Sequence, residues 1–115
     1  HAANQGMEYP MICFNFGRPN KDGTYSDRLL QGMIGVVVHE VGHNFFPMIV
    51  NSDERQSTWM DEGLNTFMEG ETIRDRYPEL NYTTATPKSM IPFMKGDRTQ
   101  MRPIMATADN QGRNH

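Results

Sequence analysis

The first apolar stretch of the chain covers residues 8–16 and has the sequence EYPMICFNF. Aromatic and aliphatic residues dominate it and Gly17 follows it, which predicts a β-strand. Pro10 has no N–H group for a strand ladder, and this favours an edge position or the beginning of the strand. Residues 17–24 (GRPNKDGT) are typical of a turn, so we expect the chain to reverse there.

The second apolar stretch predicts a long helix. Ser26 or Asp27 is a suitable N-cap, and apolar positions continue from Leu29 to about Phe45. Valines at 36–38 have strand propensity, so local preference alone leaves the choice open. The histidine spacing described below favours the helix. A stretch that is apolar on all sides indicates a helix buried in a larger body.

Polar residues 51–56 (NSDERQ) interrupt this pattern. A second helix is predicted from Thr58 to about Arg76, because Pro78 disfavours helical geometry in the residue before it. The prediction is therefore two helices separated by a short polar segment.

The chain divides into a strand and turn over residues 1–25, a helix pair over 26–76 and an irregular or helical part over 77–115. Prolines interrupt the last part, where apolar runs are short, and residues 106–115 are expected to form a mobile tail. The length fits one domain.

Composition predicts a small core. Apolar residues make up 37% of the 115 residues, and the mean hydropathy is −0.69. The ten methionines could line an adaptable binding surface, but core packing is the expected role. Cys13 is the one cysteine, which excludes an intrachain disulfide and a cysteine zinc site; we expect a buried, inert thiol.

The charge of the chain excludes two classes of partner. A net charge of −3 and a pI near 5.7 give no basic surface for nucleic acid or anionic membranes. The longest apolar run, residues 33–38, is too short to span a bilayer. Nothing in the sequence indicates a cellular compartment.

Residues 39–43 (HEVGH) form an H-E-x-x-H motif. On a helix, His39 and His43 lie on one face, so both imidazoles can reach one metal ion. Glu40 would lie beside that ion and take a proton from water, whose pKa zinc lowers towards roughly 7. The alternative is a pair of partly buried helix histidines with a solvated glutamate between them.

Glu62, in the segment WMDEGLN at residues 59–65, supplies a third candidate ligand. A helix, a short reversal and a second helix would return its carboxylate to the same ion. Two histidines and one glutamate with an open fourth position are typical of a catalytic zinc site, so we expect one zinc per chain. Asp61 could orient an imidazole or act only as first-turn helix charge.

The segment HEVGHNFFPMIVNSDERQSTWMDEGLNTF, residues 39–67, resembles the extended zinc signature of the M1 aminopeptidases, which are gluzincins. Residues 5–10 (QGMEYP) are similar to the Gly-x-Met-Glu-Asn exopeptidase motif of that family. The resemblance implies an α+β fold, namely part of a thermolysin-like zincin catalytic domain that is mainly helical with an edge strand or hairpin. It also implies a zinc aminopeptidase that acts on peptides with a free amino terminus.

By this resemblance, Glu8 would bind the α-amino group of the substrate, and Gly6 and Met7 would form the edge of the cleft. Two residues of this chain differ from the usual pattern of the family. Tyr9 stands where the family commonly has Asn, and Phe45 stands where Trp is usual.

The family's oxyanion-stabilising tyrosine lies well downstream of the glutamate ligand, and Tyr77 and Tyr82 are too close to Glu62 for that position. The chain is therefore expected to be a fragment of a larger enzyme, with exposed apolar surface that favours self-association. The alternatives are an endopeptidase or dual-function hydrolase of the same fold, or an inactive metal-binding fragment.

Overall fold

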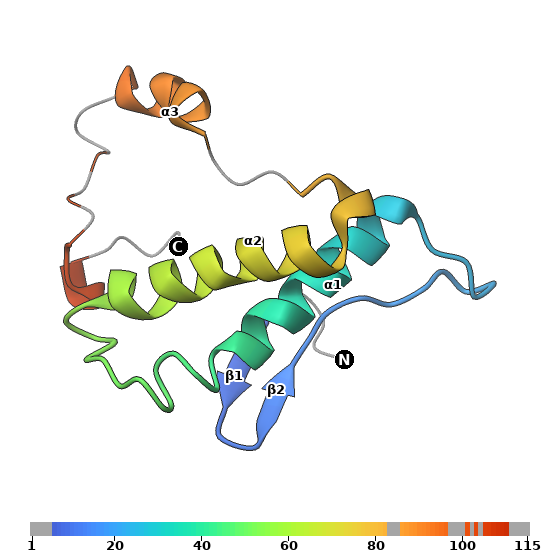
Figure 1. Ribbon diagram of the computed structural model, residues 1–115, viewed down its shortest axis with the longest axis horizontal. Coiled ribbons are helices and arrows are strands. Elements are labelled where there is room, and N and C mark those ends of the chain that lie inside the picture. Colours follow the sequence, from blue (N-terminus) through green and yellow to red (C-terminus); the bar gives the residue numbers. More distant parts are fainter. Residues whose placement is uncertain (1–5, 83–85, 97–100, 102, 104, 111–115) are drawn as a thin grey trace.

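Two helices that lie side by side form the centre of the chain (Figure 1). The computed structural model describes residues 6–82, 86–96, 101, 103 and 105–110. Helix α1 covers Asp27–Gly42, and helix α2 covers Leu64–Arg76. A two-stranded sheet, β1 and β2, lies at one end of α1. The fold is α+β, as the sequence predicts.

The sheet is a hairpin, one of the two forms that the sequence leaves open, although its two strands are shorter than the apolar stretch of residues 8–16. Strand β1 (Met7–Tyr9) pairs antiparallel with β2 (Ile12–Phe14), with Glu8 opposite Cys13. The chain reverses at Pro10 and Met11, where Met11 has φ 71°. A proline followed by a residue with positive φ is the pattern of a type II turn. Pro10 therefore begins a turn and does not mark a strand edge.

Helix α1 begins as predicted. The Ser26 hydroxyl caps it by accepting a hydrogen bond from the Leu29 amide at 3.2 Å. The helix ends at Gly42, and residues 43–49 form turns, so it is slightly shorter than predicted. The strand propensity of its three valines is overridden by the packing of α1 against α2.

The second predicted helix is present but begins irregularly. A π-helical turn, Trp59–Gly63, precedes α2, which ends at Arg76 before Pro78 as predicted. Single π-helical turns inside helices occur frequently at functional sites. This turn carries both Asp61 and Glu62.

The interior between these helices is polar. Among the described residues, Ile73 is the one buried hydrophobic side chain, whereas Glu40, His43, Asp61 and Asn65 are all buried. The expected role of the methionines in core packing is wrong for seven of them, which are exposed: Met7, Met11, Met60, Met68, Met90, Met94 and Met105. Cys13 is half-buried, not fully buried as predicted.

The C-terminal part contains the short helix α3 (Pro87–Met94) and 3-10 turns at Pro78–Leu80 and Ala108–Asn110. Thr86 and Ser89 form a capping box at the start of α3, and every residue of α3 is exposed. Figure 1 shows α3 apart from the α1–α2 pair. Asp109 pairs with Arg55 at 2.8 Å, and residues 111–115 of the predicted tail lie outside the described residues.

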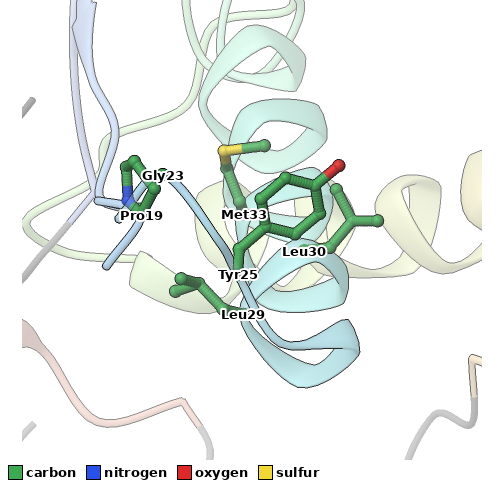
Figure 2. Close-up of a pocket in the computed structure, with 7 residues that line it drawn as sticks. Pro19, Gly23, Tyr25, Leu29, Leu30 and Met33 are labelled. Carbon is green, nitrogen blue, oxygen red and sulfur yellow. The ribbon is translucent and has the colours of Figure 1, made fainter. Parts of the chain in front are cut away.

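Two apolar pockets lie outside the predicted site. One, of about 370 Å³, is lined by Tyr25 and neighbouring loop residues together with Leu29, Leu30 and Met33 of α1 (Figure 2). The other, of about 550 Å³, lies between α1 and α2 and includes Val41, Phe45 and Val50 in its wall. Within the described residues, no helix is long and apolar enough to cross a membrane.

Candidate metal centre

The two predicted histidine ligands meet on the last turns of α1. His39 and His43 are four residues apart and therefore lie on one face of the helix. Their Nε2 atoms are 3.2 Å apart, and their rings are perpendicular, with centroids 4.7 Å apart. This arrangement brings two nitrogen donors to one point.

Glu62 reaches the same point from the π-helical turn before α2. Its Oε2 atom lies 3.1 Å from His39 Nε2 and 3.6 Å from His43 Nε2. Ligand atoms around a tetrahedral zinc ion with bonds of roughly 2.0–2.1 Å are about 3.3 Å apart. The three atoms therefore have the spacing of three corners of such a tetrahedron. The Glu62 side chain is 47% exposed, so solvent reaches this side of the site.

The hydrogen bonds of the two Nδ1 atoms determine which nitrogen of each imidazole has a lone pair available for a metal ion. His43 Nδ1 donates to the Phe46 carbonyl at 2.7 Å, and His39 Nδ1 donates to Glu69 Oε2 at 3.1 Å. Each neutral imidazole then presents an Nε2 lone pair, and the Glu62 carboxylate is also an acceptor. Three acceptors that face one another require protons or a metal cation between them, so this set of ligand atoms fits a metal ion.

The charges around the two histidines favour a cation as well. In the absence of metal, the hydrogen bond to Glu62, followed by that to Glu69, raises the pKa of His39 to about 10. Burial lowers the pKa of His43, but the nearby Glu62 carboxylate and the hydrogen bond to the Phe46 carbonyl outweigh it and raise that pKa to about 9. The hydrogen bond to His39 and the nearby His43 imidazole lower the pKa of Glu62 to about 2.

Asp61 is fully buried beside His43. Its Oδ1 atom lies 3.1 Å from His43 Nδ1, and neither carboxylate oxygen has a hydrogen-bond partner among the described residues. Burial raises the pKa of Asp61 to about 6, although the charge of His43 opposes this shift. Of the two roles considered for Asp61, the position beside the imidazole favours orientation of His43 over simple helix charge, although no hydrogen bond joins the two side chains.

Glu40 and Glu8 line the other side of His43. Glu40 is 5% exposed, and its Oε2 atom has no hydrogen-bond partner among the described residues. Glu8 Oε2 lies 3.9 Å from His43 Nε2, and donor atoms of Glu8, Glu40 and His43 lie within 4.8 Å of one another. Burial raises the pKa of Glu40, the charge of His39 opposes this, and the Glu8 carboxylate adds to the rise.

Of the two remaining predicted site residues, Gly6 lies beside the histidine cluster and Met7 does not. Gly6 lies directly against the Glu40 carboxylate, so it belongs to the cluster. Met7 is 41% exposed on β1, and its side chain points to the opposite face of the strand from Glu8. The hairpin thus brings Glu8 and Gly6 to the histidines but not Met7.

Two further residues, Asn65 and Glu69, contact His39. Glu69 Oε2 bonds its ring, and Asn65 Nδ2 donates to its backbone carbonyl at 2.8 Å. Both lie on α2, three and seven residues after Glu62, and this helical spacing is a signal that could have identified them. Asn44, next to His43 in the sequence, is exposed, and its side chain donates to the Val41 carbonyl.

Tyr82 also belongs to this network. Its hydroxyl donates to Glu69 Oε1 at 2.8 Å, and burial followed by this bond raises the pKa of Tyr82 to about 12. No local pattern in the sequence predicts this contact, because it depends on how the chain turns back after α2.

One of three comparisons with known proteins identifies a family for this chain. Residues 6–112 match the Peptidase family M1 domain. No match is found among curated proteins or among solved structures. The family match covers nearly the whole chain, including all the residues that converge on the two histidines. The chain therefore belongs to peptidase family M1.

Proposed function

We propose that this chain carries the zinc site and the catalytic base of an aminopeptidase, which removes amino-terminal residues from peptides. Membership of family M1 makes the chain a metallopeptidase with peptide substrates. The observation that carries the finer proposal is the triangle of His39 Nε2, His43 Nε2 and Glu62 Oε2, with sides of 3.2, 3.1 and 3.6 Å. These three residues would hold one zinc ion.

When bound, zinc would polarise the scissile carbonyl and lower the pKa of water. Glu40 is the proposed base. It takes a proton from the attacking water and then gives that proton to the leaving amine. Its buried position raises the pKa of its carboxyl, which suits a group that must both accept and release a proton near neutral pH.

Glu8 is proposed to hold the α-amino group of the substrate. Its carboxylate is 14% exposed and lies at the edge of the histidine cluster. A charge-assisted hydrogen bond from an ammonium group to such a carboxylate is strong. It would also fix which peptide bond lies over the metal ligands, which limits cleavage to the first residue. Gly6 and Met7 are proposed to form the cleft edge, where the substrate backbone can add as a strand.

The rival activity is that of an endopeptidase or dual-function hydrolase of the same fold. We expect the chain to hydrolyse amino-acid anilides and to leave amino-terminally blocked peptides uncleaved. Glu8→Gln should lower kcat/KM for the anilides about 10- to 100-fold, since it removes a hydrogen bond between charged groups. Glu71→Gln, which changes an exposed carboxylate paired with Arg74, is the matched control. Efficient cleavage of blocked peptides would favour the endopeptidase.

We also propose that the chain is part of a larger, thermolysin-like zincin domain. The support is physical: apolar side chains on α1, α2 and both strands are exposed, and Ile73 is the one buried apolar side chain among the described residues. Further protein packed on these faces would cover them. In this proposal residues 1–25 supply the exopeptidase motif and residues 26–76 the zinc site. The alternative is a metal-binding fragment without activity, which would bind zinc but hydrolyse no substrate.

A further inference from the structure

The contact between α1 and α2 includes two pairs of a glycine and a polar side chain. A Cβ atom on Gly42 would collide with Asn65 Oδ1, and one on Gly35 would lie 3.3 Å from Glu69 Oε1. Gly42 and Gly35 are seven residues apart on α1, and their partners are four residues apart on α2. The absence of side chains at these glycines therefore allows α2 to bring polar groups against the backbone of α1.

Both polar atoms of the Asn65 side chain face the backbone of α1. It is 1% exposed, and its Nδ2 atom donates to the His39 carbonyl at 2.8 Å. The same carbonyl accepts the His43 amide at 3.2 Å within α1. Asn65 Oδ1 faces Gly42 and has no hydrogen-bond partner among the described residues. The side chain cannot rotate away from an added methyl group on Gly42 without losing its bond to His39.

The position of Asn65 connects the two halves of the metal centre. Asn65 is three residues after Glu62, less than one turn along the same helical path. Its bond to the His39 carbonyl therefore ties the segment that carries the carboxylate ligand to the segment that carries both histidines. A shift of α2 along or away from α1 would change the distances from Glu62 Oε2 to the two Nε2 atoms.

We propose that Asn65 and Gly42 are a size-matched positioning pair, which sets the separation of α1 and α2 and with it the distance between Glu62 and the histidines. Neither residue contacts the metal. The effect of the pair on zinc affinity rests on the proposed zinc site, whereas its effect on helix packing does not.

The test is a double-mutant cycle of Gly42→Ala and Asn65→Ala. The zinc affinity of the parent chain, both single variants and the double variant is measured by competition with a chelator. Gly42→Ala should weaken zinc binding about 10- to 100-fold, which is the range for residues that support ligands. Asn65→Ala should also weaken it, because the link to His39 is lost. In the double variant the alanine methyl at 42 occupies space left by the amide, so affinity should recover to within about threefold of Asn65→Ala alone. Penalties that simply add would overturn the proposal.

A second readout does not depend on zinc. In the metal-free chain, Gly42→Ala should lower Tm by about 4–8 °C. In the Asn65→Ala background, Gly42→Ala should raise Tm. Without the Asn65 amide the new methyl group meets no close neighbour, and alanine is a better helix former than glycine. Equal shifts in both backgrounds would refute the pairing. If the parent chain binds no zinc, the proposed function fails, and this cycle still decides the pairing.

Gly32→Ala is the matched control on the same helix. A Cβ atom at Gly32 would meet only the Phe16 ring, at 3.7 Å, which is an ordinary van der Waals contact. This variant should keep the zinc affinity of the parent chain within about twofold. Asn65→Asp tests the hydrogen bond itself, because a carboxylate of the same shape cannot donate to the His39 carbonyl. It should weaken zinc binding at least as much as Asn65→Ala, and parent-like affinity would contradict the assigned role.

Discussion

At the scale of single residues, the buried positions are occupied by groups that proteins rarely bury. His43 and Asp61 are fully buried, and Glu40 and Asn65 nearly so. Burying such groups is unfavourable unless partners or a bound ion compensate for the lost hydration. Two imidazoles and several carboxylates around one point supply a negative environment for a cation. The same groups determine how the metal-free chain responds to pH.

The metal-free chain should be most stable near pH 5 and lose stability as the pH rises to 10. The pKa values of His39 and His43 are raised from 6.5 to about 10 and about 9, so their contribution is complete below about pH 6.5 and is lost through those values. Asp61, raised to about 6, acts in the same direction. The pKa of Glu62 is lowered to about 2, so its contribution is present above about pH 4.5 and is lost as pH falls through 2.

Thermal unfolding between pH 4 and pH 10 in the presence of chelator measures this dependence. Glu62→Gln should reduce the alkaline loss, because Glu62 is the largest cause of the His39 shift. Asp75→Asn, at an exposed carboxylate beside Arg76, should leave the profile unchanged. A Tm that stays level or rises between pH 6.5 and pH 10 would contradict the assignment of these charges.

At the scale of elements, the network on α2 holds His39 through Glu69. Tyr82 lies beyond α2, and its hydroxyl donates to Glu69 Oε1 while Glu69 Oε2 bonds His39. Removing that hydroxyl leaves Glu69 one partner short and free to turn away from the imidazole.

Tyr82→Phe should therefore weaken zinc binding about tenfold, near the lower end of the effect of removing groups that support metal ligands. Tyr77→Phe is the matched control, since Tyr77 is 36% exposed at the end of α2. Zinc affinity measured by chelator competition should separate the two variants. Equal affinities would show that Tyr82 does not support His39.

The helices could be predicted from sequence because their ends have local causes. Ser26 caps α1 and Pro78 follows the end of α2, and both effects act within one turn of the chain. The three candidate ligands could be predicted for a similar reason, since i and i+4 spacing places two of them on one helix face. The sequence does not decide between an edge strand and a hairpin, because Pro10 is compatible with both a strand start and a turn. The positive φ of Met11 decides between them and leaves no trace in the sequence.

The network around the ligands was harder to predict. The contact of Asn65 with the His39 carbonyl depends on how closely α1 and α2 approach, and that distance depends on glycines whose importance appears only when both helices are in place. Tyr82 reaches Glu69 from another segment, so no spacing rule applies to it.

At the scale of the whole molecule, much apolar surface faces outward. Side chains exposed beside the 550 Å³ pocket between α1 and α2 include Val41, Phe45 and Val50, with exposed fractions of 47%, 56% and 56%. Contiguous apolar surface of this kind is typical of faces that other protein covers.

The isolated chain should therefore self-associate in a concentration-dependent manner, as measured by size-exclusion chromatography with light scattering. Phe45→Lys combined with Val50→Lys should shift the population towards monomer, since two buried charges would oppose the contact. Thr66→Lys adds a charge at an exposed polar position and serves as the control. A parent chain that remains monomeric at high concentration would argue against an uncovered interface.

The central claim is that His39, His43 and Glu62 hold one zinc ion. Metal analysis of the purified chain, compared with Glu62→Ala, tests it most directly. We expect about one zinc per chain in the parent and sharply weakened binding in the variant, because one of three protein ligands is lost. Zinc bound equally by both proteins, or by neither, would contradict the metal centre described above.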